Sequence, residues 1–297
     1  MTHHMFTDWS SFRPEDLERE YSPSSCEGVD IGRLLDEYSQ ASDDARRWCL
    51  RQRRPILTDA YGPLGSQTFD IVTPERERAP LVVFIHGGYW QELSKLESFG
   101  PAPDFVSRGI AYAALDYTLA PDATVDEIVV EVCQALTTIY NRADDLNIDA
   151  DRIVIAGSSA GAHLAAMASL DPTSDWRPAG LVLLSGIYEL EPLIATTIND
   201  ALHLDVAAAK RNSPARIEIG DAPPTIVAWG SVETDQFKRQ SHFFGQRLAA
   251  AGKPPTHIEI DGRNHFDILT DLGDVSTQLG SAVDRLIENT KENHANL

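Results

Sequence analysis

From Ile56 onward, short runs of consecutive apolar residues alternate with longer segments that carry an apolar residue every third or fourth position. Runs of the first kind are typical of strands buried on both faces of a parallel sheet, and segments of the second kind are typical of helices with one buried face. The alternation predicts an α/β protein with a mostly parallel central sheet and helices on both faces. Strands are expected at residues 81–85, 110–115, 153–156, 181–184, 225–229 and 256–260. Helices are expected at about 96–108, 124–144, 161–170, 235–251 and 274–291.

Residues 1–54 precede the first strand and are polar and helical in pattern. Pro14 with acidic residues just after it is typical of a helix start, and a second helix is expected over about 30–53. We divide the chain into an N-terminal helical extension or cap (1–54) and a catalytic domain (55–297), which together form a single domain. The extension either covers an active site or only packs against the sheet.

Two further segments depart from the alternation. Residues 56–61 and 68–72 flank a Gly-Pro-Leu-Gly turn, which predicts an antiparallel hairpin. The stretch 188–217 is long and mixed, and it interrupts the alternation. Long insertions of this kind are typical of lids or substrate walls, although a packed excursion would give the same pattern.

The strongest chemical signal surrounds Ser159. An apolar run leads into Gly157–Gly161 (GSSAG), and a helical segment follows. G-x-S-x-G at a strand-to-helix turn is the nucleophile elbow of serine hydrolases. The three fixed positions alone are a weak signal, and the preceding strand and following helix strengthen it. Ser158 is a lesser alternative nucleophile, because it lacks the flanking register.

A glycine pair at Gly87 and Gly88 follows the predicted strand 81–85. Backbone N–H groups there can reach a ligand oxygen without interference from side chains, as the oxyanion of acyl transfer requires. We assign Gly87, Gly88 and the N–H of Ala160 to an oxyanion hole, the alternative being a glycine turn without special purpose. For His86, beside the pair, we expect a structural role.

His265 is the best candidate for the general base. It lies in a loop after the predicted strand 256–260, and it is the last catalytic candidate along the chain, in the order nucleophile, acid, histidine. The acid is expected after strand 225–229, where Glu233 and Asp235 both qualify. Either carboxylate could orient the imidazole.

Composition excludes several classes of partner. The formal net charge of −20 would repel nucleic acids and anionic membranes, and no apolar run reaches the ~20 residues of a membrane span. We see no signal peptide, and three cysteines without C-x-x-C spacing suit a reducing cytoplasm. No histidine-rich spacing suggests a metal site, so neither a metal nor another cofactor is expected.

Four motifs recur together in this chain: residues 86–90 (HGGYW), 116–121 (DYTLAP), 157–161 (GSSAG) and 265–267 (HFD). This set resembles the hormone-sensitive-lipase-like branch of the α/β hydrolases. Further marks are residues 90–91 (WQ), 94–95 (SK), 185–190 (SGIYEL), 213–214 (SP), 237–241 (FKRQS) and 265–268 (HFDI). With these marks the chain is most similar, within that branch, to the kynurenine formamidases (arylformamidases), and the resemblance covers roughly residues 55–290.

The resemblance implies a triad of Ser159, Glu233 and His265. The family usually has aspartate at the position of Glu233, so this residue is a departure, and Asp235 is the reserve candidate. Tyr89 is a second departure from the wider branch, where many members have a third glycine.

The implied reaction is hydrolysis of N-formyl-L-kynurenine to L-kynurenine and formate. An aromatic leaving group would suit aromatic walls, for which Tyr89, Trp90, Tyr188 and Trp229 are candidates. The alternatives are a carboxylesterase for short acyl or aryl esters, an amidase for another aryl or cyclic amide, and a non-catalytic binding protein on the same fold. The partner is then a small molecule, and because relatives are often dimers the resemblance leaves a homodimer open.

Overall fold

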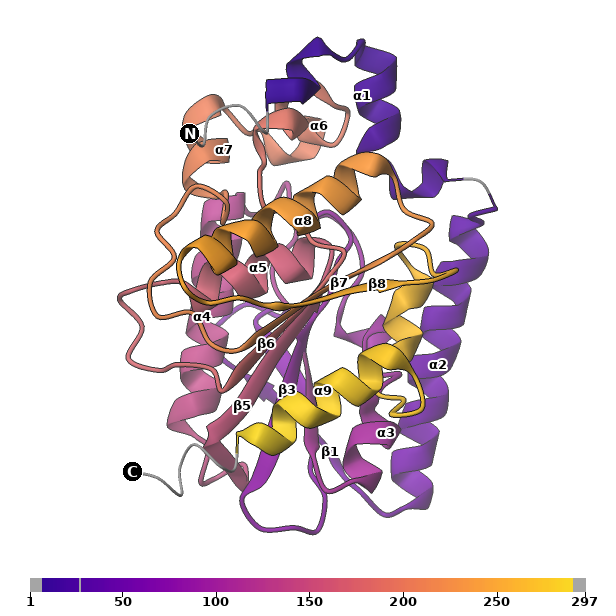
Figure 1. Cartoon of the computed structure of the whole chain (residues 1–297). Coiled ribbons are helices and arrows are strands. Elements are labelled where there is room, and N and C mark those ends of the chain that lie inside the picture. The colour runs from indigo at the N-terminus through magenta and orange to yellow at the C-terminus, as the bar shows by residue number, and fades with distance from the viewer. Residues whose placement is uncertain (1–6, 27, 291–297) are drawn as a thin grey trace.

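The computed structural model describes residues 7–26 and 28–290, and a single eight-stranded sheet forms its centre (Figure 1). The strand order is β1-β2-β4-β3-β5-β6-β7-β8. β1 and β2 form the predicted antiparallel hairpin, β2 is also antiparallel to β4, and the other neighbours are parallel. The predicted α/β class is therefore confirmed. The strands are β1 (Ile56–Ala60), β2 (Thr68–Val72), β3 (Ala79–Ile85), β4 (Ala111–Leu115), β5 (Ile148–Ser158), β6 (Gly180–Leu184), β7 (Thr225–Gly230) and β8 (Thr256–Ile260).

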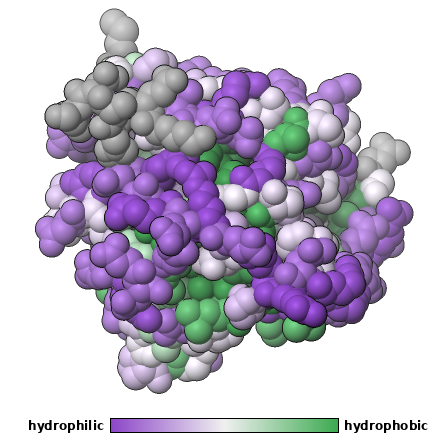
Figure 2. All heavy atoms as spheres, turned by 90° about the horizontal axis from the view of Figure 1, so that it is seen from below, coloured by the Kyte–Doolittle hydropathy of each residue, from purple (hydrophilic) through white to green (hydrophobic). Residues whose placement is uncertain are grey.

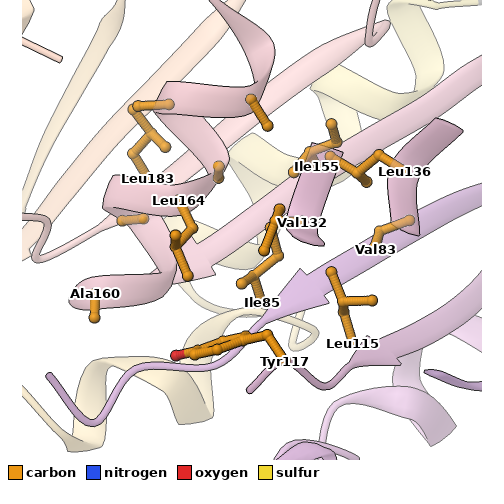
Figure 3. Packing of buried hydrophobic residues seen from close by; sticks show 14 of the residues in the cluster. Val83, Ile85, Leu115, Tyr117, Val132, Leu136, Ile155, Ala160, Leu164 and Leu183 are labelled. Atoms are coloured by element: carbon orange, nitrogen blue, oxygen red, sulfur yellow. The ribbon is translucent and has the colours of Figure 1, made fainter. Parts of the chain in front are cut away.

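Helices cover both faces of the sheet, and strand side chains divide between the two faces by simple alternation. Val83 and Ile85 of β3 belong to one apolar cluster, which also contains residues of α4 (Val125–Asn141), α5 (Ala160–Ser169) and α8 (Asp235–Ala250). Figure 3 shows this packing around Ile85, Ile155 and Leu164. Val82 and Phe84 belong to the second cluster, with residues of α2 (Ile31–Arg51), α3 (Ala102–Ser107) and α9 (Gln278–Asn289). Burial on both faces explains why these strands read as continuous apolar runs.

Two predicted helices differ from those observed. The helix expected over 96–108 is broken into a 3-10 turn at Lys95–Glu97 and α3, because Gly100 and Pro101 interrupt it. The helix expected from residue 274 begins at Gln278, where the hydroxyl of Thr277 accepts a hydrogen bond from Gly280 N at 3.0 Å. Its predicted end at residue 291 lies outside the described residues.

The N-terminal segment contains a 3-10 turn (Thr7–Ser11), α1 (Pro14–Glu20), a second 3-10 turn (Pro23–Ser25) and the long helix α2. Both predicted helices are thereby confirmed. The interrupting stretch after β6 contains a 3-10 helix (Glu191–Ala195), α6 (Asn199–Leu202) and α7 (Val206–Arg211). Figure 1 shows α1 beside this stretch at one end of the molecule, where the carboxylate of Glu18 accepts a hydrogen bond from Thr197 N at 2.9 Å.

The surface agrees with the acidic, polar composition. In the view of Figure 2, hydrophilic residues cover most of the face and hydrophobic residues gather in separate patches. Within the described ranges, no helix combines the length and the apolar character that a membrane crossing requires.

Candidate active site

Ser159 stands at the turn between β5 and α5, and its backbone is strained. It has φ 56° and ψ −119°, values that a non-glycine residue adopts only at a cost, and such strain is concentrated at functional sites. Its N–H donates to Leu184 O of β6 at 2.8 Å. Gly161 is required by close packing, because a Cβ there would collide with the carbonyl oxygen of Ile85. The turn therefore holds Ser159, 6% exposed, at the N-terminus of a buried helix.

The glycine pair after β3 lies directly against this serine. A Cβ added to Gly87 would lie 2.9 Å from Ser158 O and 3.1 Å from Ser159 Cβ, so the backbone approaches the nucleophile candidate closely. Gly88 has φ +93°, which favours glycine. Ala160 is the first residue of α5, where backbone N–H groups are free of helical partners. Gly87 and Ala160 therefore lie beside Ser159, and Gly88 follows Gly87 in the same loop.

His86 fixes the conformation of this loop. Its Nδ1–H donates to Gly87 O at 2.9 Å, and its ring stacks on Tyr117 at 4.2 Å between centroids. The Tyr117 hydroxyl donates in turn to His86 O at 3.0 Å. These contacts give His86 a structural position, as expected from the sequence.

Glu233 and His265 lie together at the same edge of the sheet. The Nδ1 of His265 is 3.1 Å from Oε2 of Glu233, and both residues are buried. Oε1 of Glu233 accepts from the Ser185 hydroxyl at 2.6 Å and from Gly230 N at 2.5 Å. The carboxylate thus accepts from three donors, and Nδ1 of the imidazole is held by Oε2.

Asp235 lies elsewhere. Its side chain is 84% exposed and is 3.7 Å from the ammonium group of Lys238. It is the first residue of α8, where an acid stabilises the helix N-terminus. The structure brings Glu233 to His265 and leaves Asp235 in solvent.

Ser159 and His265 line one cavity of about 360 Å3, within the range of small-molecule sites. Gly87 and Gly88 line it as well. The cavity has apolar and polar sides, and several walls come from the N-terminal segment and from the stretch after β6. Apolar lining residues include Pro23, Ile31, Leu35, Tyr38, Leu93, Ile198, Phe266 and Leu269. Polar ones include Glu18, Gln91, Glu92 and Thr197.

Of the four aromatic candidates for substrate contact, one lines the cavity and three do not. Tyr89 lines the cavity, and its hydroxyl donates to Tyr21 O at 2.5 Å. Burial places the pKa of its phenol well above the ordinary value. Trp90, Tyr188 and Trp229 are not among the lining residues and are buried in the core instead.

These three side chains have ring partners in the core. The Trp90 ring meets His163 edge-on at 4.9 Å, and Tyr188 stacks on Phe244 at 4.3 Å. Trp229 packs against His242 at 4.5 Å. Each ring belongs to the packing between sheet and helices. The positions of these rings do not support the expected contact with substrate.

The sequence did not identify which residues of the N-terminal segment line the cavity. Ile31, Leu35 and Tyr38 are spaced i, i+4 and i+7 along α2, which brings them to one stripe of the helix. The Tyr38 hydroxyl donates to Phe266 O at 2.5 Å, next to His265. In the sequence, these residues could have been found as a second apolar stripe on α2, besides the stripe that packs on the sheet.

His163, in the helix after the elbow, is fully buried and structural. Burial lowers its pKa to about 4, so the ring is neutral at pH 7. Its Nε2–H donates to Asn212 O at 2.6 Å. Among the side chains of residues 7–26 and 28–290, no group of three or more His, Cys, Asp or Glu is placed to hold a metal ion.

Comparison with known proteins agrees with this geometry. The sequence profile of the BD-FAE family matches residues 69–177. A kynurenine formamidase of Danio rerio is 29% identical over 283 residues, which cover 90% of this chain and 94% of the fish protein. A kynurenine formamidase of Drosophila melanogaster is 27% identical, over 86% of this chain and 92% of its own. The chain has the α/β-hydrolase fold and is similar in sequence to the kynurenine formamidases.

Solved structures support the same fold for this hydrolase. A protein of Silicibacter sp., provisionally described as a thioesterase, superposes with a TM-score of 0.80 at 26% identity, over 91% of this chain and 99% of that one. An esterase of Pyrobaculum calidifontis superposes with a TM-score of 0.69 at 18% identity, over 90% and 94% of the two chains, and shows the fold alone. The chain is therefore a hydrolase, similar to known formamidases and esterases.

Proposed function

We propose that this enzyme hydrolyses an aryl formamide, and that N-formyl-L-kynurenine is its substrate. The observation that carries the proposal is the buried pair of Glu233 and His265, with Nδ1 to Oε2 at 3.1 Å, in which His265 lines one cavity together with Ser159. Similarity to kynurenine formamidases over nine tenths of the chain supports the formamide.

In the proposed reaction, Ser159 attacks the formyl carbon and passes its proton to Nε2 of His265. The backbone N–H groups of Gly87, Gly88 and Ala160 stabilise the oxyanion that forms. His265 then protonates the departing aryl amine and activates a water molecule, which releases formate and restores Ser159. Glu233 holds the imidazole in the required tautomer and stabilises its charged form.

We further propose that residues 1–54 act as a cap on this site. The apolar stripe of α2 with Phe266 and Leu269 would hold the aryl ring. The polar side of the cavity, with Glu18, Gln91 and Thr197, would face the amino-acid part of the substrate.

A carboxylesterase is the second candidate, and the esterase relatives favour it. Isoprenylcysteine methylesterase of Arabidopsis thaliana is 26% identical over 73% of this chain. The same serine, histidine and oxyanion donors would serve an ester. An amidase for another aryl or cyclic amide would use them equally.

The deciding experiment compares kcat/KM for N-formyl-L-kynurenine and for p-nitrophenyl acetate, in the wild type and in Ser159→Ala. We expect a clear preference for the formamide and loss of both activities in the variant. A preference for the ester would replace the formamidase assignment with the esterase one. Full activity of Ser159→Ala on both substrates would remove the serine mechanism.

We also propose a cytoplasmic location, because the three cysteines are free thiols and Cys49 is buried in the core. Fractionation of the native host, with the enzyme followed by antibody, would test it. Recovery outside the cytoplasm would contradict it.

A further inference from the structure

Ser185 occupies the junction between the strands that carry the nucleophile and the acid. It directly follows β6, and β6 lies between β5 and β7 in the sheet. Its N–H donates to Ala228 O of β7 at 2.8 Å, while the preceding carbonyl, of Leu184, accepts from Ser159 N at 2.8 Å. The backbone at this point is therefore bonded to both halves of the proposed catalytic machinery.

The conformation of Ser185 is unfavourable for a residue with a side chain. Its φ is +49°, in the left-handed region, although the next residue, Gly186, could adopt such an angle freely. Ser185 is also fully buried. Strain of this kind persists only where the surroundings enforce it, and it is a reason to look for a function of the side chain.

The Ser185 hydroxyl reaches the acid directly. It donates to Oε1 of Glu233 at 2.6 Å, and Gly230 N donates to the same oxygen at 2.5 Å. Oε2 is left for Nδ1 of His265 at 3.1 Å. We propose that Ser185 is a positioning residue of the catalytic acid, which holds the Glu233 carboxylate so that Oε2 faces the imidazole. This inference rests on the proposed serine mechanism.

The role follows from the length of the side chain. Glutamate has one more rotatable bond than aspartate, so a buried glutamate needs a further contact to fix its carboxylate in one orientation. A serine hydroxyl supplies a charge-assisted hydrogen bond, the stronger kind. The same bond withdraws negative charge from the carboxylate and so tunes how firmly Glu233 holds the charged imidazole.

Other charged or titratable groups face this carboxylate and stay unchanged in the test. These groups are Cys26, directly after the 3-10 turn Pro23–Ser25, Tyr188, four residues after β6, and Asp267, two residues after His265. The negative charge of Glu233 raises the pKa of all three. A difference between wild type and a variant at Ser185 therefore reports the hydroxyl.

Two variants separate the hydroxyl from the backbone strain. Ser185→Ala removes the hydroxyl and keeps the Cβ, whereas Ser185→Gly removes the hydroxyl and relaxes the positive φ. Ser169→Ala is the matched control, because Ser169 is also buried and its hydroxyl has no hydrogen-bond partner within the described part of the chain. Each protein is assayed for kcat and KM against pH, and its thermal unfolding is measured.

We expect kcat to fall about 10- to 100-fold in both Ser185 variants, with KM nearly unchanged. The acidic limb of the pH profile of kcat/KM should move to higher pH, because a carboxylate with one donor fewer holds the charged imidazole more firmly. Ser185→Gly should unfold at a higher temperature than Ser185→Ala yet be equally slow. Ser169→Ala should retain the wild-type kcat and profile.

Wild-type kcat and pH profile in Ser185→Ala would overturn the inference. So would a recovery of kcat in Ser185→Gly, since strain and not the hydroxyl would then be responsible. Ser159→Ala, measured in parallel, distinguishes a failure of the serine mechanism from a failure of the role of Ser185. If it stays active, the serine mechanism itself fails; if it is inactive while Ser185→Ala is normal, only the role of Ser185 fails.

Discussion

Replacing Gly87 by alanine tests the proposed oxyanion hole with a single methyl group. The added Cβ would lie 2.9 Å from Ser158 O and 3.1 Å from Ser159 Cβ. Ordinary van der Waals contact begins at 3.4 Å, so one of the two loops has to move by about half an ångström. Both neighbours are buried main chain or its first side-chain atom, and neither can turn away as the end of a long side chain can.

The expected loss follows from that movement. If the glycine loop retreats, its N–H groups leave the position where the oxyanion forms, and loss of one such donor costs about 2.7–4 kcal/mol, or roughly 100- to 1,000-fold in kcat. Ground-state binding depends on other walls, so KM should stay within about threefold. Overpacking by one methyl group should also lower the free energy of unfolding by about 1–3 kcal/mol.

The measurement is steady-state kinetics of Gly87→Ala on the preferred substrate, with thermal unfolding in parallel. Gly220→Ala is the control, because a Cβ there meets nothing within 4 Å and the residue is exposed. We expect the control to behave as the wild type. A Gly87→Ala enzyme with kcat within about threefold of the wild type would refute the assignment of this loop to the oxyanion hole.

Three further predictions concern the acid, the buried histidine and the cap. Glu233→Gln should lose at least about 100-fold in kcat, whereas Asp235→Asn, whose side chain is 84% exposed, should stay within about twofold; a larger effect at Asp235 would reverse the assignment. His163 has a folded pKa of about 4 against an ordinary 6.5, so the unfolded chain takes up the proton first and stability falls as the pH drops from 6.5 towards 4, by up to about 3 kcal/mol. Urea unfolding at pH 7 and 4.5 should show a shallower fall in His163→Gln, and an equal fall in both proteins would contradict this. Tyr38→Phe leaves the carbonyl of Phe266 without its donor at 2.5 Å, and we expect the free energy of unfolding to fall by about 1–3 kcal/mol and kcat to fall about threefold or more; a lower unfolding temperature with unchanged kcat would limit Tyr38 to packing.

The sheet was predictable from sequence because its strands are buried on both faces. Val82 and Val83 of β3 belong to opposite apolar clusters, so both faces of the strand are apolar and the strand appears in the sequence as a short continuous apolar run. The ends of helices were harder to predict. Apolar spacing continued through Gly100 and Pro101, and only the backbone chemistry of these two residues divides the predicted helix.

The aromatic walls were not predictable from motif position alone. Tyr89 and Trp90 are adjacent in sequence, yet Tyr89 lines the cavity while Trp90 packs edge-on against His163 in the core. The side chain of a residue at a strand end can point towards the site or into the core, and the sequence motif does not determine which. The residues that do form the wall, such as Leu35 and Tyr38, lie on α2, more than a hundred residues before the nucleophile.

Motif spacing left the catalytic acid open between Glu233 and Asp235, and the preference for acidic residues at helix N-termini could have decided between them. Glu233 and Asp235 both follow β7, but Asp235 begins α8, where an acidic residue stabilises the helix N-terminus without any catalytic role. The start of α8 therefore explains the presence of Asp235, whereas no helix end explains the presence of Glu233. Burial of Glu233 against His265 and Ser185 then needs a reason of its own, because an ionised carboxylate is costly to bury unless donors surround it. Three donors around a buried glutamate, one of them from a strained serine, are an arrangement that packing alone would not require.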